Sequence, residues 1–144
     1  MTLSIFPDVN VWVALAYSRH VHHPVAVRWF ESLGDEDELI FCRHTQMGLL
    51  RLLTLPAVMG EEILSQREAW RIYDAFFASP LVRFLTEPRD IESSFRRFAR
   101  SSIATPQDWA DSYLAAFAEH ASLRLVTFDK SLSARVPRSR LLRP

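Results

Sequence analysis

The sequence predicts a three-layer α/β/α fold around a short parallel sheet, and two observations lead to this class. Short apolar runs typical of buried strands alternate along the chain with longer segments that carry helix signals. Strands that alternate with helices favour crossover connections, which make the sheet parallel. The 144 residues suit one core, and no repeat or long linker divides them. We therefore expect a single domain over residues 1–144.

The expected strands are short, and helices dominate the pattern. Strands are predicted at residues 2–7, 39–42, 81–85 and 123–127. Helices are predicted at residues 10–18, 22–33, 45–54, 65–77, 90–100 and 105–119, with a short one after Asp129.

Several of these helices are supported by particular residues. Residues 10–18 are nearly all apolar, so this helix is expected to be buried on most sides or covered by a partner. The helix at 45–54 has Met47, Leu50 and Leu53 at core spacing and is expected to end at Pro56. Ser65 with Glu68 three residues later is typical of a capping box.

The charge pattern is compatible with contacts to nucleic acid but does not require them. The net charge is zero, and sixteen of the seventeen basic residues are arginine. Arginine binds phosphate with a planar fork, although a GC-rich coding sequence would also produce this bias. The cations cluster in two stretches, at residues 96–100 and 135–143.

Composition also limits the chemistry and the compartment. The single cysteine, Cys42, excludes a disulfide within the chain and a cysteine-rich zinc site, and its apolar surroundings predict a buried thiol. Neither a signal peptide nor an apolar run long enough to span a bilayer is visible, so a cytoplasmic protein is expected.

Three aspartates are the strongest candidates for a functional site. Asp8 and Asp129 each follow a predicted strand, and Asp111 lies in the first turns of a predicted helix. The carboxyl ends of parallel strands gather at one edge of a sheet, where ligands bind. Carboxylates that meet there offer the oxygen ligands preferred by Mg²⁺ or Mn²⁺. Each aspartate alone could be a helix cap, but the three together predict a metal site.

Two neighbouring residues have different expected roles. Asp108 lies three residues after Thr105, so a capping box accounts for it, although it could still reach the metal. Thr127 precedes Asp129 by two residues and faces the same side of the strand, where its hydroxyl could orient a carboxylate or a water.

The order and spacing of these blocks resemble the PIN-domain family, and within it the VapC-type ribonuclease toxins. The resemblance runs from Asp8-Val-Asn-Val through Thr45-Gln46 and Arg51 to Asp111-Ser-Tyr-Leu-Ala-Ala and Thr127-Phe-Asp129. It implies that Asp8, Asp111 and Asp129 match the first, third and fourth acids of the family.

The resemblance places Gln46 where the family usually has a glutamate. An amide oxygen can still ligate a hard cation, but it brings no negative charge. We therefore expect weak metal binding that RNA phosphate helps to complete. Arg51 belongs to the same block and could pair with an active-site acid or with RNA phosphate.

The implied function is hydrolysis of RNA phosphodiester bonds by metal-activated water, with Mg²⁺ or Mn²⁺ as cofactor. The implied partners are an RNA substrate, a VapB-like antitoxin and a second copy of the chain. The apolar side chains Val11, Trp12, Leu15 and Tyr17 fit either an interface or plain core packing.

Two other functions remain open. One is a PIN nuclease of RNA maturation without an antitoxin. The other is a catalytically weakened module that binds RNA.

Overall fold

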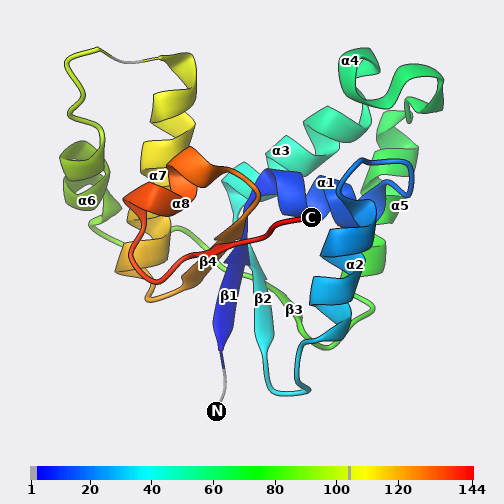
Figure 1. The fold of residues 1–144 in the computed structure, drawn as a ribbon, viewed down its shortest axis with the longest axis horizontal. Coiled ribbons are helices and arrows are strands. Elements are labelled where there is room, and N and C mark those ends of the chain that lie inside the picture. The colour runs from blue at the N-terminus through cyan, green and yellow to red at the C-terminus, as the bar shows by residue number, and fades with distance from the viewer. Residues whose placement is uncertain (1–2, 104) are drawn as a thin grey trace.

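A five-stranded parallel sheet lies at the centre of the computed structural model, which describes residues 3–103 and 105–144. The strand order is β3-β2-β1-β4-β5 (Figure 1). The strands are β1 (Ser4–Pro7), β2 (Glu38–Phe41), β3 (Val82–Phe84), β4 (Arg124–Thr127) and β5 (Arg140–Leu141). The predicted first strand included Thr2, which lies outside the described residues.

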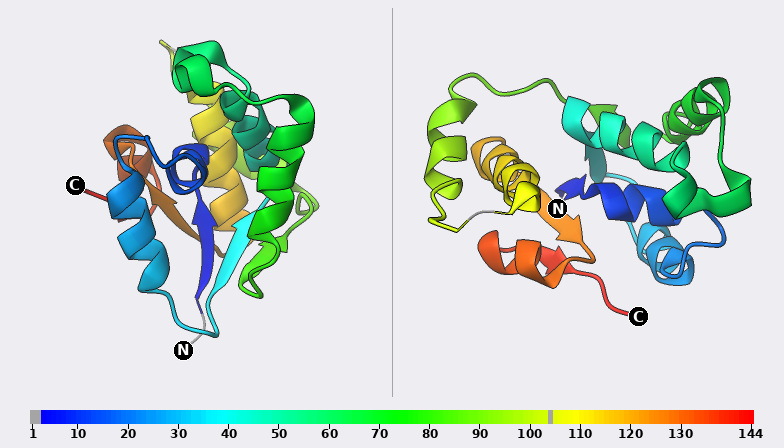
Figure 2. Two further views of the ribbon diagram at one scale, coloured as in Figure 1. Left: turned by 90° about the vertical axis from the view of Figure 1, so that its right-hand side faces the viewer. Right: turned by 90° about the horizontal axis from the view of Figure 1, so that it is seen from above.

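Helices cover both faces of the sheet, so the predicted α/β/α class is confirmed (Figures 1 and 2). The helices are α1 (Val9–Ala16), α2 (His23–Glu31), α3 (Arg43–Leu53), α4 (Pro56–Met59), α5 (Gln66–Phe76), α6 (Ile91–Phe98), α7 (Pro106–His120) and α8 (Lys130–Arg135). Successive strand residues alternate between two cores. Ile5 packs with α1, α2, α3 and α5, whereas Phe6 packs with α6, α7 and α8.

The apolar helix α1 is part of the first core. Val11 and Trp12 are fully buried within the chain. The ring of Trp12 stacks on Phe41 at 3.8 Å between centroids, and Leu15 and Tyr17 pack partly buried against the same core. Core packing therefore accounts for this helix. The alternative that Val11 and Trp12 form an interface is wrong, because neither is accessible.

Two predicted details differ from the structure, and one strand was not predicted. Pro56 does not merely end a helix but begins α4, where its missing N–H and fixed φ suit the first turn. The short strand β5 gave no sequence signal because it has only two residues. Met47, predicted as a core residue, is 61% exposed. Within residues 3–103 and 105–144, no helix has the length and apolar character needed to cross a bilayer.

Gly48 allows α3 to approach the start of α1 closely. A Cβ atom at this position would lie 2.6 Å from Val9 Cγ2. Val9 directly follows Asp8, so the contact between these two helices lies beside the first predicted site residue.

We expect Gly48→Ala to lower the free energy of unfolding by up to about 2 kcal/mol, measured by urea unfolding. Overpacking against the stiff valine side chain costs about 1–3 kcal/mol and outweighs a gain in helix propensity of about 1 kcal/mol. In a Val9→Ala background the clash is absent, so the same change should stabilise the protein. An equal effect in both backgrounds would contradict the contact.

Candidate active site

Asp8 lies where β1 ends and α1 begins, with its carboxylate held by two donors. Val9 N donates to Oδ1 at 2.7 Å, and the Thr127 hydroxyl donates to Oδ2 at 2.8 Å. The first bond makes Asp8 the N-cap of α1. The side chain is only 7% exposed, so a nearly buried carboxylate is fixed at the carboxyl edge of the sheet.

Thr127 connects the first aspartate with the last. The residue is fully buried at the end of β4, and its hydroxyl also accepts a hydrogen bond from Asp129 N at 2.9 Å. The hydroxyl therefore donates to one site aspartate while it accepts from the backbone of another. Asp129 in turn caps α8, where its Oδ1 accepts from Ser131 N at 2.8 Å and from Leu132 N at 3.3 Å.

Asp111 reaches the same edge of the sheet from α7. It is 6% exposed, and its Oδ1 accepts a hydrogen bond from Gln107 Nε2 at 3.0 Å. Gln107 was not among the predicted site residues, although its position one helical turn before Asp111 is the signal that could have identified it. Asp108 behaves as a capping residue, because its Oδ2 accepts from Thr105 N at 2.7 Å.

The electrostatic couplings show that the three aspartates act on one another. Burial raises the pKa of Asp8, and the carboxylates of Asp111 and Asp129 raise it further, against the lowering effect of its hydrogen bonds. Burial also raises the pKa of Asp111, together with the charges of Asp129 and Asp108, while Gln107 and Arg135 lower it. The site therefore carries negative charge that its protein surroundings do not fully offset.

A hollow of about 560 Å³ opens beside Asp8 and Asp129, and Asp111 is not among its lining residues. Its walls come from α1, α3, α7 and the turn after β4. The lining residues are Asp8, Val9, Asn10, His44, Met47, Gly48, Arg51, Leu52, Gln107, Ala110, Leu114 and Asp129.

The helix α3 contributes one face to this hollow. His44, Met47, Gly48 and Arg51 recur at helical spacing along that face. Arg51 is exposed, and burial lowers the pKa of His44. The sequence predicted Arg51 as an auxiliary residue but did not identify His44 or Gly48, whose roles depend on which face of α3 meets α1.

Gln46 does not join the aspartates, which corrects its expected position. It points from the opposite side of α3, where it is buried and its Oε1 accepts from Arg43 Nη1 at 2.6 Å. Burial raises the pKa of Tyr73 on α5, and the neighbouring Gln46 side chain lowers it. Gln46 therefore lies towards α5 and not towards the hollow. The face of α3 that lines the hollow supplies no carboxylate of its own.

The donor chemistry of the site fits a divalent cation. All three aspartates offer carboxylate oxygens, the ligands that Mg²⁺ and Mn²⁺ prefer. No hydrogen bond joins Asp111 Oδ2 or Asp129 Oδ2 to another described residue. Within the same residues, no group of three or more acidic, histidine or cysteine side chains is already arranged to hold an ion. The hydrogen bond from Gln107 is to Asp111 Oδ1, so it leaves Oδ2 available to an ion.

The fold and the site together define an α/β protein with an acidic, metal-type site at the carboxyl edge of a parallel sheet. The family model of the PIN domain matches residues 5–137, and the chain belongs to the PIN-domain family. This finding confirms the resemblance seen in the sequence motifs.

The relatives are VapC-type members of that family. Ribonuclease VapC41 of Mycobacterium tuberculosis is 41% identical over 130 residues, which cover 88% of this chain and 89% of that protein. The crystal structure of Mycobacterium tuberculosis VapC20, a sarcin-ricin loop cleaving toxin, has a TM-score of 0.66 at 19% identity and covers 90% of this chain and 93% of that chain. VapBC2 from Rickettsia felis, bound to a promoter DNA fragment, has a TM-score of 0.69 at 11% identity, covering 96% and 97%. At these identities the two structures show a shared fold.

Thr127→Val should destabilise the protein by about 1–3 kcal/mol, because Asp129 N would lose its buried acceptor and Asp8 would lose a donor. Thr127→Ser keeps the hydroxyl and serves as the matched control. Urea unfolding of both variants measures the difference. Equal stability of the valine and serine variants would contradict the bridging role of the hydroxyl.

Asp111→Asn should raise the melting temperature at neutral pH. The pKa of Asp111 is raised above 3.8 in the folded state, so the folded protein binds the proton more tightly than the unfolded chain. Its ionisation therefore lowers stability as pH rises above 3.8, and the deficit persists at neutral pH. The asparagine variant lacks this deficit.

The gain should disappear in acid, where wild-type Asp111 is protonated. Thermal unfolding at several pH values measures this, with the exposed Asp74→Asn as the control for a lost surface charge. A wild type that is more stable than Asp111→Asn at neutral pH in the absence of metal would contradict the assigned direction.

Proposed function

We propose that this chain is a divalent-metal-dependent endoribonuclease and the toxin of a VapBC-type toxin–antitoxin pair. The observation that carries the proposal is the gathering of Asp8, Asp111 and Asp129 at the carboxyl edge of the sheet. Similarity to Ribonuclease VapC41 over most of both chains supports RNA as the substrate. Buried carboxylates with raised pKa values are typical of functional sites.

Asp8, Asp111 and Asp129 would hold the cation, which we expect to be Mg²⁺ or Mn²⁺. When bound, such a cation lowers the pKa of water and offsets negative charge on the phosphate. Thr127 keeps the Asp8 carboxylate in one orientation, which limits the rearrangement needed to form the site. Gln107 would hold Asp111 in place until the metal arrives.

Arg51 would contact the RNA backbone. It lines the hollow together with Asp8 and Asp129, and its guanidinium can bind phosphate with two parallel hydrogen bonds. A cation there offsets the repulsion between an acidic site and a polyanionic substrate. This role differs from that of a metal ligand and does not require contact with Gln46.

An antitoxin is the expected protein partner, and VapBC2 of Rickettsia felis is a solved complex with a similar toxin fold. Met47 offers it an apolar contact, because this side chain is 61% exposed at the rim of the acidic hollow. A second copy of the chain is the other expected partner, as the resemblance to the family implies.

Asp8→Ala should abolish cleavage of RNA while the circular dichroism spectrum remains that of a folded protein. The measurement is RNA cleavage in Mg²⁺ or Mn²⁺, with EDTA added to the wild type as a second test. Removing the metal should stop cleavage, because the proposed chemistry depends on it.

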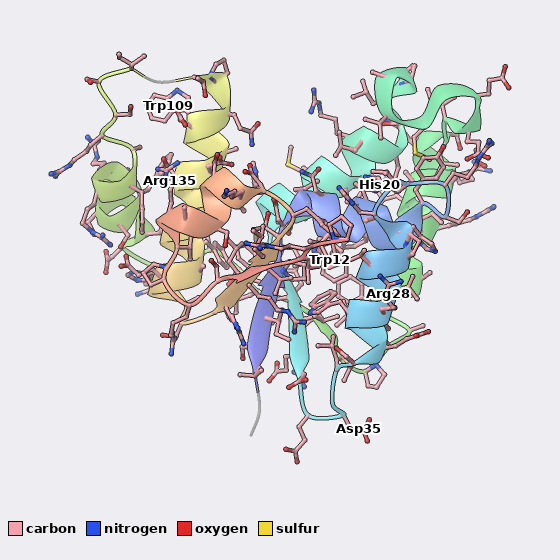
Figure 3. All side chains as sticks on the ribbon, in the orientation of Figure 1. Trp12, His20, Arg28, Asp35, Trp109 and Arg135 are labelled. Carbon is pink, nitrogen blue, oxygen red and sulfur yellow. The ribbon has the colours of Figure 1, made fainter. Side chains whose placement is uncertain are left out.

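Asp35→Ala is the matched control, since this exposed aspartate lies in the turn before β2, at the opposite end of the sheet (Figure 3). Cleavage that survives in folded Asp8→Ala, or in EDTA, would overturn the proposed function.

A further inference from the structure

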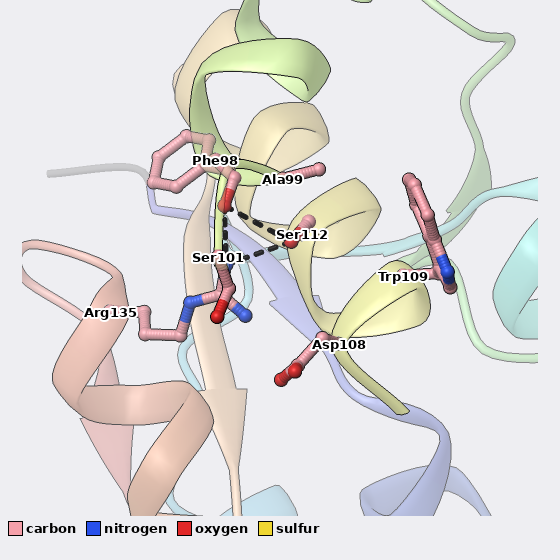
Figure 4. A pocket seen from close by; sticks show the side chains of 7 residues that line it. All are labelled: Phe98, Ala99, Ser101, Asp108, Trp109, Ser112 and Arg135. Carbon is pink, nitrogen blue, oxygen red and sulfur yellow. Dashed lines mark hydrogen bonds between the residues drawn. The ribbon is translucent and has the colours of Figure 1, made fainter. Parts of the chain in front are cut away.

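A second hollow, of about 340 Å³, lies beside the aspartates on the other side of α7. Its lining combines aromatic, acidic, hydroxyl and basic side chains: Phe98, Ala99, Ser101, Asp108, Trp109, Ser112 and Arg135 (Figure 4). Asp108 and Ser112 are the neighbours of Asp111 on α7, so this hollow adjoins the site of the proposed cleavage. The three aspartates do not by themselves indicate what this hollow binds.

Arg135 forms a fixed wall of this hollow. Its Nη2 donates to the Phe98 carbonyl oxygen and to Ser112 Oγ, both at 2.8 Å. Ser112 is fully buried and also donates to the same carbonyl at 3.3 Å. This network ties α6, α7 and α8 together, so the wall is held in place before any ligand arrives.

Trp109 separates this hollow from another one further from the aspartates. The indole is 59% exposed and lies across the hollow from Arg135 (Figure 4). The indole of Trp109 also makes an edge contact with the ring of Phe95, at 6.3 Å between ring centroids. The farther hollow is lined by Glu92, Phe95, Arg96, Ala99, Arg100 and Trp109.

In the farther hollow, Arg100 is a cation that could bind a ligand, whereas Arg96 is already paired. Arg96 is paired with Glu92 at 3.0 Å. No ion pair within residues 3–103 and 105–144 involves Arg100, which is exposed. Moving outward from Asp111, the surface therefore presents a polar hollow, an exposed aromatic ring and a cation.

We propose that the hollow of Trp109 and Arg135 receives a nucleobase of single-stranded RNA next to the phosphate at the aspartates, and that Arg100 binds a phosphate beyond it. This inference rests on the proposed ribonuclease function. Single-stranded nucleic acid is bound by aromatic rings that stack on bases and by cations that follow the backbone. Asp108 Oδ1 and Arg135 Nη1 make no hydrogen bond to another described residue, so they provide an acceptor and a donor for base edges.

The test is the binding of fluorescein-labelled oligo-A, oligo-C and oligo-U RNA of equal length, measured by anisotropy. An Asp8→Ala background keeps the RNA intact. Trp109→Ala should weaken binding at least about five-fold, because stacking on an aromatic ring contributes that much per base. Trp109→Phe keeps a stacking surface and should retain most of the affinity. Trp70→Ala removes another exposed tryptophan, on α5, and should leave binding unchanged.

Salt dependence tests the role of Arg100 separately. Arg100→Gln should reduce the slope of log affinity against log salt by about 0.7, the value for one phosphate contact on a single strand. Arg67→Gln, an exposed cation on α5, should not change the slope. Trp109→Ala should weaken binding without changing the slope of the salt dependence.

The outcomes distinguish this inference from the proposed function. If the catalytically intact protein cleaves RNA but Trp109→Ala binds every oligonucleotide as tightly as Trp70→Ala does, the base subsite is wrong and the ribonuclease stands. If Trp109→Ala instead loses only affinity for the antitoxin, the hollow belongs to the protein partner and the inference is overturned. RNA binding that depends on Trp109, without any cleavage by the intact protein, would uphold the subsite and overturn the proposed function.

Discussion

The hydrogen bond from Thr127 to Asp8 is the interaction on which the geometry of the acidic site depends. It joins the ends of β1 and β4, which are neighbours in the sheet only because a parallel crossover brings distant segments together. The same hydroxyl accepts from Asp129 N, so one buried oxygen sets the positions of two aspartates. The bond also explains why Asp8 can be almost fully buried, because a desolvated carboxylate requires donors.

Two buried carboxylates, Asp8 and Asp111, and the half-buried Asp129 repel one another, and this repulsion would give the proposed site its affinity for cations. Burial and the neighbouring carboxylates raise the pKa values of Asp8 and Asp111, so ionisation of either group has a cost in free energy. A divalent cation would remove much of that cost. The hollow face of α3 adds a cation, Arg51, rather than another acid. Phosphate oxygens of the substrate are thus well suited both to complete the metal's ligands and to pair with Arg51.

Much of this arrangement could be predicted from the sequence, because its signals are local. Asp8 and Asp129 follow strands and cap helices, and Thr105 with Asp108 marks the start of α7. The misplacement of Gln46 has a different cause. Which face of α3 meets the aspartates is set by its crossing with α1 at Gly48 and Val9, a contact between distant segments. The two-residue strand β5 is likewise stabilised by pairing with β4 and not by any pattern of its own.

The register of α7 determines how the two hollows share the surface. Successive residues on a helix are about 100° apart, so Gln107 and Asp111 share one face while Asp108 and Ser112 share the next. The first face meets the acidic site, and the second lines the hollow of Trp109 and Arg135. The bond from Thr105 N to Asp108 fixes where the helix begins. A shift of this register by one residue would rotate every side chain by about 100°, which would move Asp111 away from the acidic site. The buried packing of Leu114, Ala115 and Phe117 holds the register, so it is a constraint on the active site as well as on the stability of the helix.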